Sequence, residues 1–400
     1  MRRPTSPRRV VAWAGVVVGL GAAFVALPPI EARSPVWPVV IGLVALTVGI
    51  GSFIRGERRI GAYAIAAGAF GLVIGYLATV SSAGHLEAVV VWSALFASTL
   101  RFATPLIFAS LGGLFSERSG VVNIGLEGMM LTGAFFAVWG ADVTGTWTLG
   151  LLIGMLSGGA MALVYAFFAI TLRADQIVGG TAVNFLALGL TSYLVIDIYG
   201  NDGTPTDVDP IPTISTGFLA DIPVVGHFMF DPASGVLGDS SAMIWAAIAM
   251  VPITYVVVFR TPVGLRLRAV GEQPRAADTV GINVYLMRYG AVTMSGMLAA
   301  AGGAYISLGF VHSFTQNLIA GRGFIALAAL IFGNWRPLGA ATACLLFGFS
   351  SALARSMQEY STSIATLFEA LPYVLTLIAV AGVIGRSIPP AAVGRPYRKQ

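Results

Sequence analysis

Apolar runs long enough to cross a lipid bilayer recur along almost the whole chain, and they constrain its fold more than any other feature. A membrane-spanning helix needs about 20 mostly apolar residues. The candidate segments are residues 10–28, 36–54, 60–80, 89–115, 122–141, 147–170, 177–198, 242–259, 284–310, 323–332, 338–357 and 371–384. The segment 323–332 is too short to span alone, so it either begins earlier, near Leu318, or is re-entrant. We therefore predict an all-α, polytopic transmembrane helical bundle with about 12 spans.

The composition disfavours the alternatives to a membrane protein. Of the 400 residues, 56% are hydrophobic and 10% are charged, whereas an ordinary soluble domain has about 25% charged residues. Soluble enzymes and nucleic-acid-binding proteins are therefore disfavoured. The single cysteine, Cys344, excludes intrachain disulfides and thiolate metal clusters. His85, His227 and His312 lie in or beside expected outer loops, without metal-ligand spacing.

A single lysine limits the chemistry of the chain. A phosphate-binding P-loop needs a lysine followed by serine or threonine, and Lys399 is followed by Gln400. The chain cannot hydrolyse ATP by that mechanism. We expect it to bind no cofactor, so that any ATP-driven step takes place on another polypeptide.

The distribution of basic residues predicts the orientation in the membrane, because cytoplasmic loops carry an excess of arginine and lysine. The terminal basic residues are Arg2, Arg3, Arg8 and Arg9 at one end, and Arg386, Arg395, Arg398 and Lys399 at the other. We expect both termini to be cytoplasmic, with 386–400 as a basic tail. The loop 199–241 has six aspartates and no lysine or arginine, so we expect it to be external.

The first informative motif is Ser116–Met130, SERSGVVNIGLEGMM, in which a short polar turn joins two spans. Asn123 and Glu127 are four residues apart and share one helix face. A carboxylate in a membrane helix is costly and usually faces the bundle interior or a watery cavity. This motif has two interpretations: Glu127 lines the translocation path, or it is stabilised near the cytoplasmic end by a helix N-terminus or by Arg118.

The second motif is the inner loop of residues 260–283. Pro274–Val280 can form a short helix that starts at a favoured proline position and ends before Gly281. A small face of Ala276 and Ala277 could sit in a groove of a cytoplasmic partner, with register set by charge. The candidate contact residues are Arg268, Glu272, Pro274, Arg275, Ala276, Ala277 and Asp278. The alternative is an ordinary basic inner loop.

The third motif is Ser313–Gly339, where polar, glycine-rich backbone interrupts two apolar stretches. Transporters place substrate sites at such broken helices. Gln316 and Asn317, together with Asn184, are candidates for the path because amides can pair with base or sugar edges. The alternative is an outer loop followed by a tight inner turn at Asn334–Pro337.

These three motifs resemble the permease family of ABC importers for ribose, branched-chain amino acids and nucleosides. The closest resemblance is to its nucleoside-type (basic membrane protein-associated) branch. The resemblance covers about residues 60–385 and leaves a basic tail and hairpin, residues 1–59, outside a ten-helix permease core. It implies that the loop 260–283 carries the helix that couples to the ATPase.

The same resemblance implies partners. They are a cytoplasmic ATP-binding subunit with two fused nucleotide-binding domains, a second homologous permease subunit and an external substrate-binding lipoprotein.

Spans four to seven would start outside and spans nine to twelve inside, which is the arrangement of an inverted repeat. We expect a path for a small polar solute, with nucleosides favoured over ribose, other sugars and branched-chain amino acids. An ion-coupled secondary transporter would need a chain of buried ionisable groups, for which Glu127 is the one candidate.

Overall fold

The computed structural model describes residues 7–26, 36–80, 92–200, 203–206, 208–220, 229–233, 235–358, 370 and 388–398. The chain forms two compact units, Met1–Trp92 and Ser93–Gln400. The predicted span 371–384 lies outside the described residues, as do His85, His227 and Lys399.

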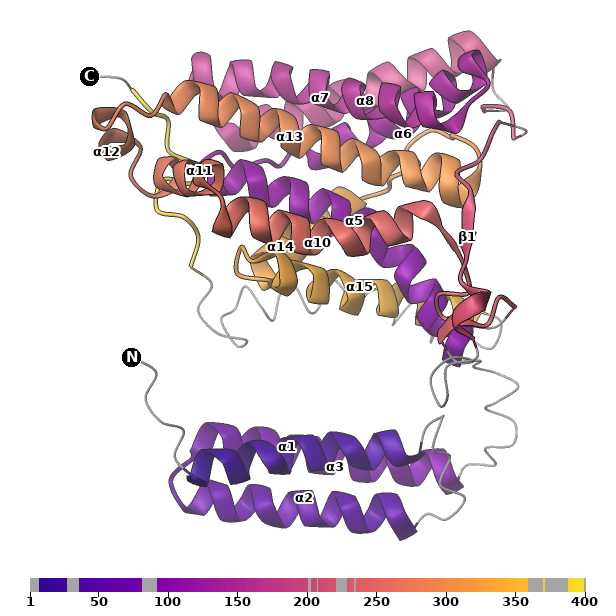
Figure 1. Cartoon of the computed structure of the whole chain (residues 1–400), viewed down its shortest axis with the longest axis vertical. Helices are drawn as coiled ribbons and strands as arrows, with labels where there is room; N and C mark the ends of the chain where they lie inside the picture. Colours follow the sequence, from indigo (N-terminus) through magenta and orange to yellow (C-terminus); the bar gives the residue numbers. More distant parts are fainter. Residues whose placement is uncertain are drawn as a thin grey trace. The chain divides into compact units, whose positions relative to one another are not determined.

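The first unit is a three-helix bundle. Its helices are α1 (Pro7–Ala26), α2 (Val36–Ile54) and α3 (Arg58–Val80), and each packs on the other two (Figure 1). Glycines allow this close approach, since a Cβ on Gly49 would lie 2.7 Å from the backbone nitrogen of Ile65. This unit holds α3 together with the hairpin that lies outside the family resemblance, because small residues of α3 pack on α1 and α2.

The second unit is also built from helices (Figure 1). They are α5 (Trp92–Arg118), α6 (Leu126–Thr144), α7 (Trp147–Ala166), α8 (Gln176–Tyr199), α10 (Ala242–Arg260), α11 (Pro262–Glu272), α12 (Pro274–Thr279), α13 (Val284–Ala304), α14 (Arg322–Phe332) and α15 (Pro337–Gln358). Two π-helical turns, Phe167–Thr171 and Tyr305–Val311, extend α7 and α13.

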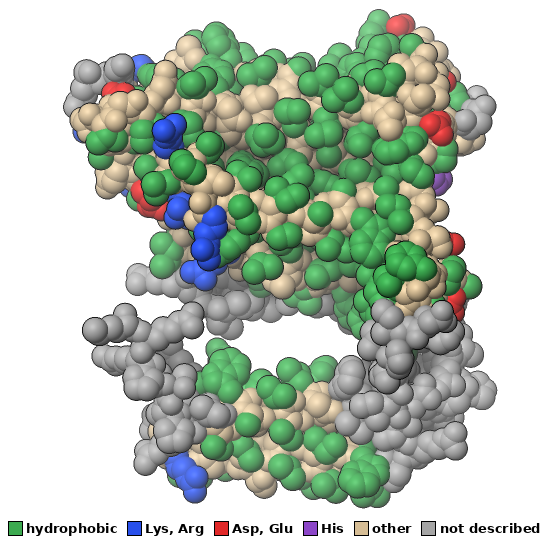
Figure 2. All heavy atoms as spheres, in the orientation of Figure 1, with side chains coloured by type: hydrophobic (Ala, Val, Ile, Leu, Met, Phe, Trp, Pro, Cys, Tyr) green, Lys and Arg blue, Asp and Glu red, His purple; other side chains and the backbone are tan. Residues whose placement is uncertain are grey.

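Seven helices of the described part are long and apolar enough to cross a membrane. They are Val36–Ile54, Trp92–Arg118, Trp147–Thr171, Gln176–Tyr199, Ala242–Arg260, Val284–Val311 and Pro337–Ser356. In Figure 2 the face of the second unit is covered by hydrophobic side chains, and the visible basic side chains gather near α11 and α12. The prediction of an all-α, multi-pass membrane protein is confirmed.

Small residues hold the core of the second unit together. A Cβ on Gly133 of α6 would lie 2.5 Å from the Cα of Ala300 in α13, and one on Gly296 of α13 would overlap Ala162 of α7. Such close packing replaces the hydrophobic driving force that helices lack in lipid. Cys344 is fully buried, and its sulfur lies 3.3 Å from the hydroxyl oxygen of Ser110.

The described residues between α8 and α10, which are 203–206, 208–220, 229–233 and 235–241, are here called the β lobe. The lobe lies at the end of the second unit opposite α11 and α12 (Figure 1). Strands β1 (Thr213–Ser215) and β2 (Asp239–Ser241) pair antiparallel, with Ile214 opposite Ser240. The carboxylate of Asp209 accepts a 2.9 Å hydrogen bond from the backbone nitrogen of Trp147. This bond ties the lobe to the first turn of α7.

Candidate functional site

The polar turn between α5 and α6 is buried inside the second unit, and other helices satisfy its backbone. The side-chain oxygen of Gln176 in α8 accepts a 2.8 Å hydrogen bond from the Val122 nitrogen. The hydroxyl of Tyr165 in α7 donates to the Val122 carbonyl. Irregular backbone is tolerated within a membrane protein only where the protein covers it. Gln176 and Tyr165 provide that cover here.

The Glu127 carboxylate joins α6 to α14. Its Oε1 accepts a 2.6 Å hydrogen bond from the Gly321 nitrogen, and its Oε2 accepts one of 2.6 Å from the Gly323 nitrogen. The first N–H groups of a helix have no partner within that helix, and its N-terminus favours negative charge. Gly323 must be glycine for this approach, because a Cβ there would lie 2.5 Å from the Glu127 nitrogen.

Asn123 and Asn184 meet at the same turn. The Asn184 side chain accepts a 2.8 Å bond from the Gly128 nitrogen and donates a 3.0 Å bond to the Ile124 carbonyl. The Asn123 amide nitrogen donates to the Ser295 hydroxyl of α13 at 2.9 Å. The Asn123 side-chain oxygen is buried without a hydrogen-bond partner among the described residues. Asn123, Glu127 and Asn184 therefore converge on the start of α6.

Gln316 and Asn317 do not join this group through any described hydrogen bond. Both are exposed, and Asn317 has a positive φ of 56° in the turn that precedes α14. The nitrogen of the neighbouring Phe314 donates to the Thr204 hydroxyl at 2.6 Å, and the Phe314 carbonyl accepts a 3.3 Å bond from the Thr204 nitrogen. The hydrogen bonds to Glu127 come instead from Gly321, just before α14, and from Gly323 in the first turn of α14.

A second buried contact, missed in the sequence, holds the turn between α14 and α15. The guanidinium of Arg118 donates to the Trp335 carbonyl at 2.7 and 3.1 Å. The Trp335 indole donates to the Glu117 carboxylate. Arg118 lies in the first sequence motif and Trp335 in the third, and 217 residues separate them. The spacing of residues in the sequence therefore could not predict this contact.

The loop 260–283 rests on the turn between α5 and α6. A Cβ on Gly271 of α11 would overlap the carbonyl of Arg118. The guanidinium groups of Arg118 and Arg268 lie 5.4 and 5.1 Å from the centre of the Phe259 ring. These contacts join α10, α11 and the end of α5.

The short helix α12 begins at Pro274, as predicted, and ends at Thr279, one residue before the predicted end at Val280. Gly281 follows at a positive φ of 86°. The predicted face of two alanines is wrong, however. Ala276 is exposed, whereas Ala277 is 3% exposed and packs inward with Val270, Val284 and Tyr397. Residues one apart on a helix do not share a face.

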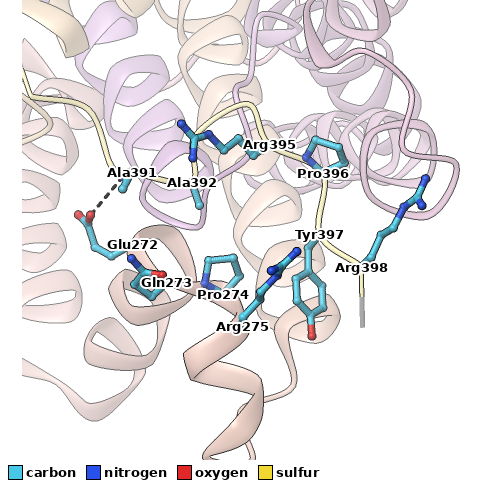
Figure 3. Close-up of a pocket in the computed structure, with 10 residues that line it drawn as sticks. All are labelled: Glu272, Gln273, Pro274, Arg275, Ala391, Ala392, Arg395, Pro396, Tyr397 and Arg398. Carbon is cyan, nitrogen blue, oxygen red and sulfur yellow. Dashed lines mark hydrogen bonds between the residues drawn. The ribbon is translucent and has the colours of Figure 1, made fainter. Parts of the chain in front are cut away.

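The outward side of α12 carries Arg275, Ala276 and Thr279, followed by Val280, which is 75% exposed. Asp278 is half-buried, and Pro274 and Arg275 line a cavity between α12 and the C-terminal segment (Figure 3). Arg268 is half-buried, and Glu272 accepts a hydrogen bond from Ala391 at 3.1 Å. The described residues contain no group of three or more side chains able to hold a metal ion.

Known proteins resemble this chain over most of its length. The guanosine ABC transporter permease protein NupQ of Bacillus subtilis is 44% identical over 324 residues, which cover 78% of this chain and 99% of NupQ. The nucleoside ABC transporter permease protein NupC of Lactococcus lactis is 40% identical, covering 76% of this chain and 96% of NupC. A putative glucose ABC transporter permease protein, TsgC13 of Haloferax volcanii, is 35% identical and covers 67% of this chain and 78% of TsgC13.

No solved structure matches the chain. The family described as branched-chain amino acid transport system, permease component, matches residues 95–380. This match covers more than half of the chain and begins after the three-helix unit, whereas the sequence motifs had suggested a start near residue 60. The buried turn, α14 and the loop 260–283 all lie within it. The chain is therefore a member of the permease-component family of branched-chain amino acid transport systems.

Proposed function

We propose that this chain is a permease subunit that forms the path for nucleosides in an ATP-driven importer. The observation that carries the proposal is the identity of 44% with a guanosine permease across 99% of that protein. A similar match to a nucleoside permease of a second organism supports the same substrate class.

The partners follow from this assignment. A cytoplasmic ATP-binding subunit binds and hydrolyses ATP, since the one lysine of this chain is not in a P-loop. A second homologous permease subunit completes the path, and an external substrate-binding lipoprotein delivers the solute. Both termini and α12 face the cytoplasm, and the β lobe faces outward. This chain binds no cofactor.

The ATP-binding subunit contacts the outward side of α12, which carries Arg275, Ala276, Thr279 and Val280. Movement of α12 passes to α11, whose Gly271 rests on the Arg118 carbonyl. Arg118 begins the buried turn that leads to Asn123 and Glu127, and Glu127 holds the start of α14. A continuous series of contacts thus joins the ATPase-facing helix to α14, the short helix at the proposed path.

The substrate assignment is tested by guanosine uptake in cells that contain this permease and its partner subunits. We expect saturable uptake that other nucleosides inhibit and glucose does not. A sugar is the second candidate because of the 35% identity to a putative glucose permease. Inhibition by glucose alone would contradict the nucleoside assignment.

The coupling surface is tested by Ala276→Glu, with Ala276→Ser as the matched control. Ala276 is exposed, so the larger acidic side chain leaves the permease folded but blocks a close protein contact. We expect the Glu variant to lose uptake and co-purification with the ATP-binding subunit, and the Ser variant to retain both. Normal uptake by the Glu variant would show that the ATP-binding subunit contacts a surface other than α12.

A further inference from the structure

We infer that the C-terminal residues 388–398, here called the tail segment, clamp the loop 260–283 against the rest of the second unit. The clamp lets α11 and α12 move with the bundle as one body. This inference deepens the proposed function, because it concerns the part of the chain that we propose contacts the ATP-binding subunit.

Backbone N–H groups of the tail segment bind two separate parts of the unit besides the loop. Towards the loop, the Ala392 nitrogen donates to the Gly271 carbonyl at 2.9 Å. Away from it, the Gly394 nitrogen donates to the Gly120 carbonyl at 3.3 Å, and the Ile388 nitrogen donates to the Asn334 side chain at 3.0 Å. The tail segment therefore connects α11 with the α5–α6 turn and with the α14–α15 turn.

Arg288 anchors the tail segment from α13. Its side chain is 1% exposed, and its Nη1 donates to the Arg395 carbonyl at 3.2 Å. Its Nε and Nη2 have no hydrogen-bond partner among the described residues. A buried charge is strongly destabilising when its remaining partner is removed. Arg288 therefore favours the state in which the tail segment is in place.

Tyr397 fills the space behind α12. It is 6% exposed and packs with Val270 of α11, Ala277 of α12 and Val284 of α13. Its ring lies edge-on to Tyr285, with centroids 5.6 Å apart. Burial, together with a hydrogen bond to the Asp278 carboxylate, raises the pKa of Tyr397 to about 12. The phenol therefore remains a protonated donor at neutral pH.

The direction of this packing distinguishes a clamp from an inhibitory segment. Tyr397 covers the inward side of α12, where Ala277 lies, and leaves Arg275, Ala276 and Thr279 exposed. An inhibitory segment would cover that exposed side. A cavity of about 480 Å³ is lined by the tail segment and by residues 272–275, beside the 3.1 Å hydrogen bond from Ala391 to Glu272. In Figure 3 the Arg395 and Arg398 side chains point away from Arg275 rather than converging with it.

A helix as short as α12 also needs support from outside itself. Isolated helices shorter than about 12 residues are marginal in water, and α12 has six residues. Its position therefore depends on tertiary contacts, of which Tyr397 supplies a large apolar part. Without them the ATP-binding subunit would displace α12 locally instead of moving the bundle.

The first test measures hydrogen exchange in the purified full-length permease without partners. We expect Tyr397→Ala to speed amide exchange in Pro262–Thr279 about tenfold, because local opening becomes easier. Arg398→Ala, an exposed change in the same segment, should leave exchange unchanged. Equal exchange in wild type and Tyr397→Ala would overturn the inference. This result does not depend on the transported solute, so it separates the clamp from the proposed function.

The second test locks the tail segment in place in the assembled transporter. Gln273→Cys and Pro396→Cys line the same cavity, so a short bismaleimide can join them after Cys344→Ala removes the natural thiol. We expect cross-linked and unlinked protein to transport at equal rates. Loss of transport on cross-linking would mean that the tail segment must leave during the cycle, which would overturn the clamp. Lack of uptake in both forms and in wild type would count against the proposed function, and the exchange test would still decide the clamp.

Discussion

Both carboxylate oxygens of Glu127 accept hydrogen bonds from backbone N–H groups at the start of α14. A neutral side chain of the same shape cannot accept both of these bonds. In Glu127→Gln, the amide nitrogen would face the N–H group of Gly321 or Gly323, donor against donor. We expect a loss of about 1–3 kcal/mol in stability, the cost of an unsatisfied buried group, and reduced guanosine uptake. Thermal unfolding of the purified protein and uptake in cells measure the two effects.

Asp142→Asn is the matched control on the same helix. Asp142 accepts one hydrogen bond, from the Tyr199 hydroxyl at 2.8 Å, and an amide oxygen can still accept it. We expect this variant to behave like the wild type. Equal stability of Glu127→Gln and wild type would show that the bonds to Gly321 and Gly323 contribute little.

The spacing of Asn123 and Glu127 predicted that both lie on one face of the same helix, and only the position of Glu127 is as predicted. Helix α6 begins at Leu126, so Glu127 lies in its first turn, whereas Asn123 lies in the irregular turn before the helix. The bond to Gly321, 194 residues away, depends on tertiary packing that spacing does not encode. Gln316 and Asn317 were expected beside the path because they are polar. The positive φ of Asn317 indicates that this residue forms part of a turn, a role that asparagine often has.

At the scale of helices, the contact between α7 and α13 depends on glycines that leave no room for a side chain. A Cβ on Gly296 would overlap Ala162 and the Gly158 carbonyl, whereas a Cβ on Gly290 of the same helix meets nothing within 4 Å. We expect Gly296→Ala to destabilise the protein by about 1–3 kcal/mol through overpacking, measured by thermal unfolding in detergent. Gly290→Ala should show no loss. A similar response of the two variants would contradict close packing at this crossing.

Helix limits were predictable where the sequence carries end signals, as at Pro274 and Gly281 around α12. The brevity of α14 was also visible, because its apolar run is short. The π-helical turns Phe167–Thr171 and Tyr305–Val311 were not predicted. Their side chains are as apolar as those of the α-helices that they extend, so hydropathy does not reveal the change in winding.

For the whole molecule, the proposed orientation places the two ends of the second unit on opposite sides of the membrane. The two ends should therefore differ in their accessibility to a reagent added outside the cell. Phe218 in the β lobe is 79% exposed, and Thr279 at the end of α12 is also exposed. In a chain carrying Cys344→Ala, we expect Phe218→Cys to react with an impermeant maleimide in intact cells. Thr279→Cys should react only after permeabilisation. Labelling of both sites in intact cells, or the reverse order, would refute the proposed orientation.

The division of the chain into units could be predicted only in part. The N-terminal hairpin lacked resemblance to the three motifs, which separated it from the permease core. The apolar run of α3 looks like any other span, and only its packing on α1 and α2 shows that it belongs to the first unit. Contacts between segments, rather than the segments themselves, determine this boundary.

The tail segment gives the order of protein synthesis a structural meaning. Residues 388–398 leave the ribosome after the helices that they join, so their bonds to Gly271, Gly120 and Arg288 can form only after those helices have been made. A chain cut short before residue 388 could insert its earlier helices but would lack these contacts. The support behind α12 is therefore complete only once residues 388–398 have been made.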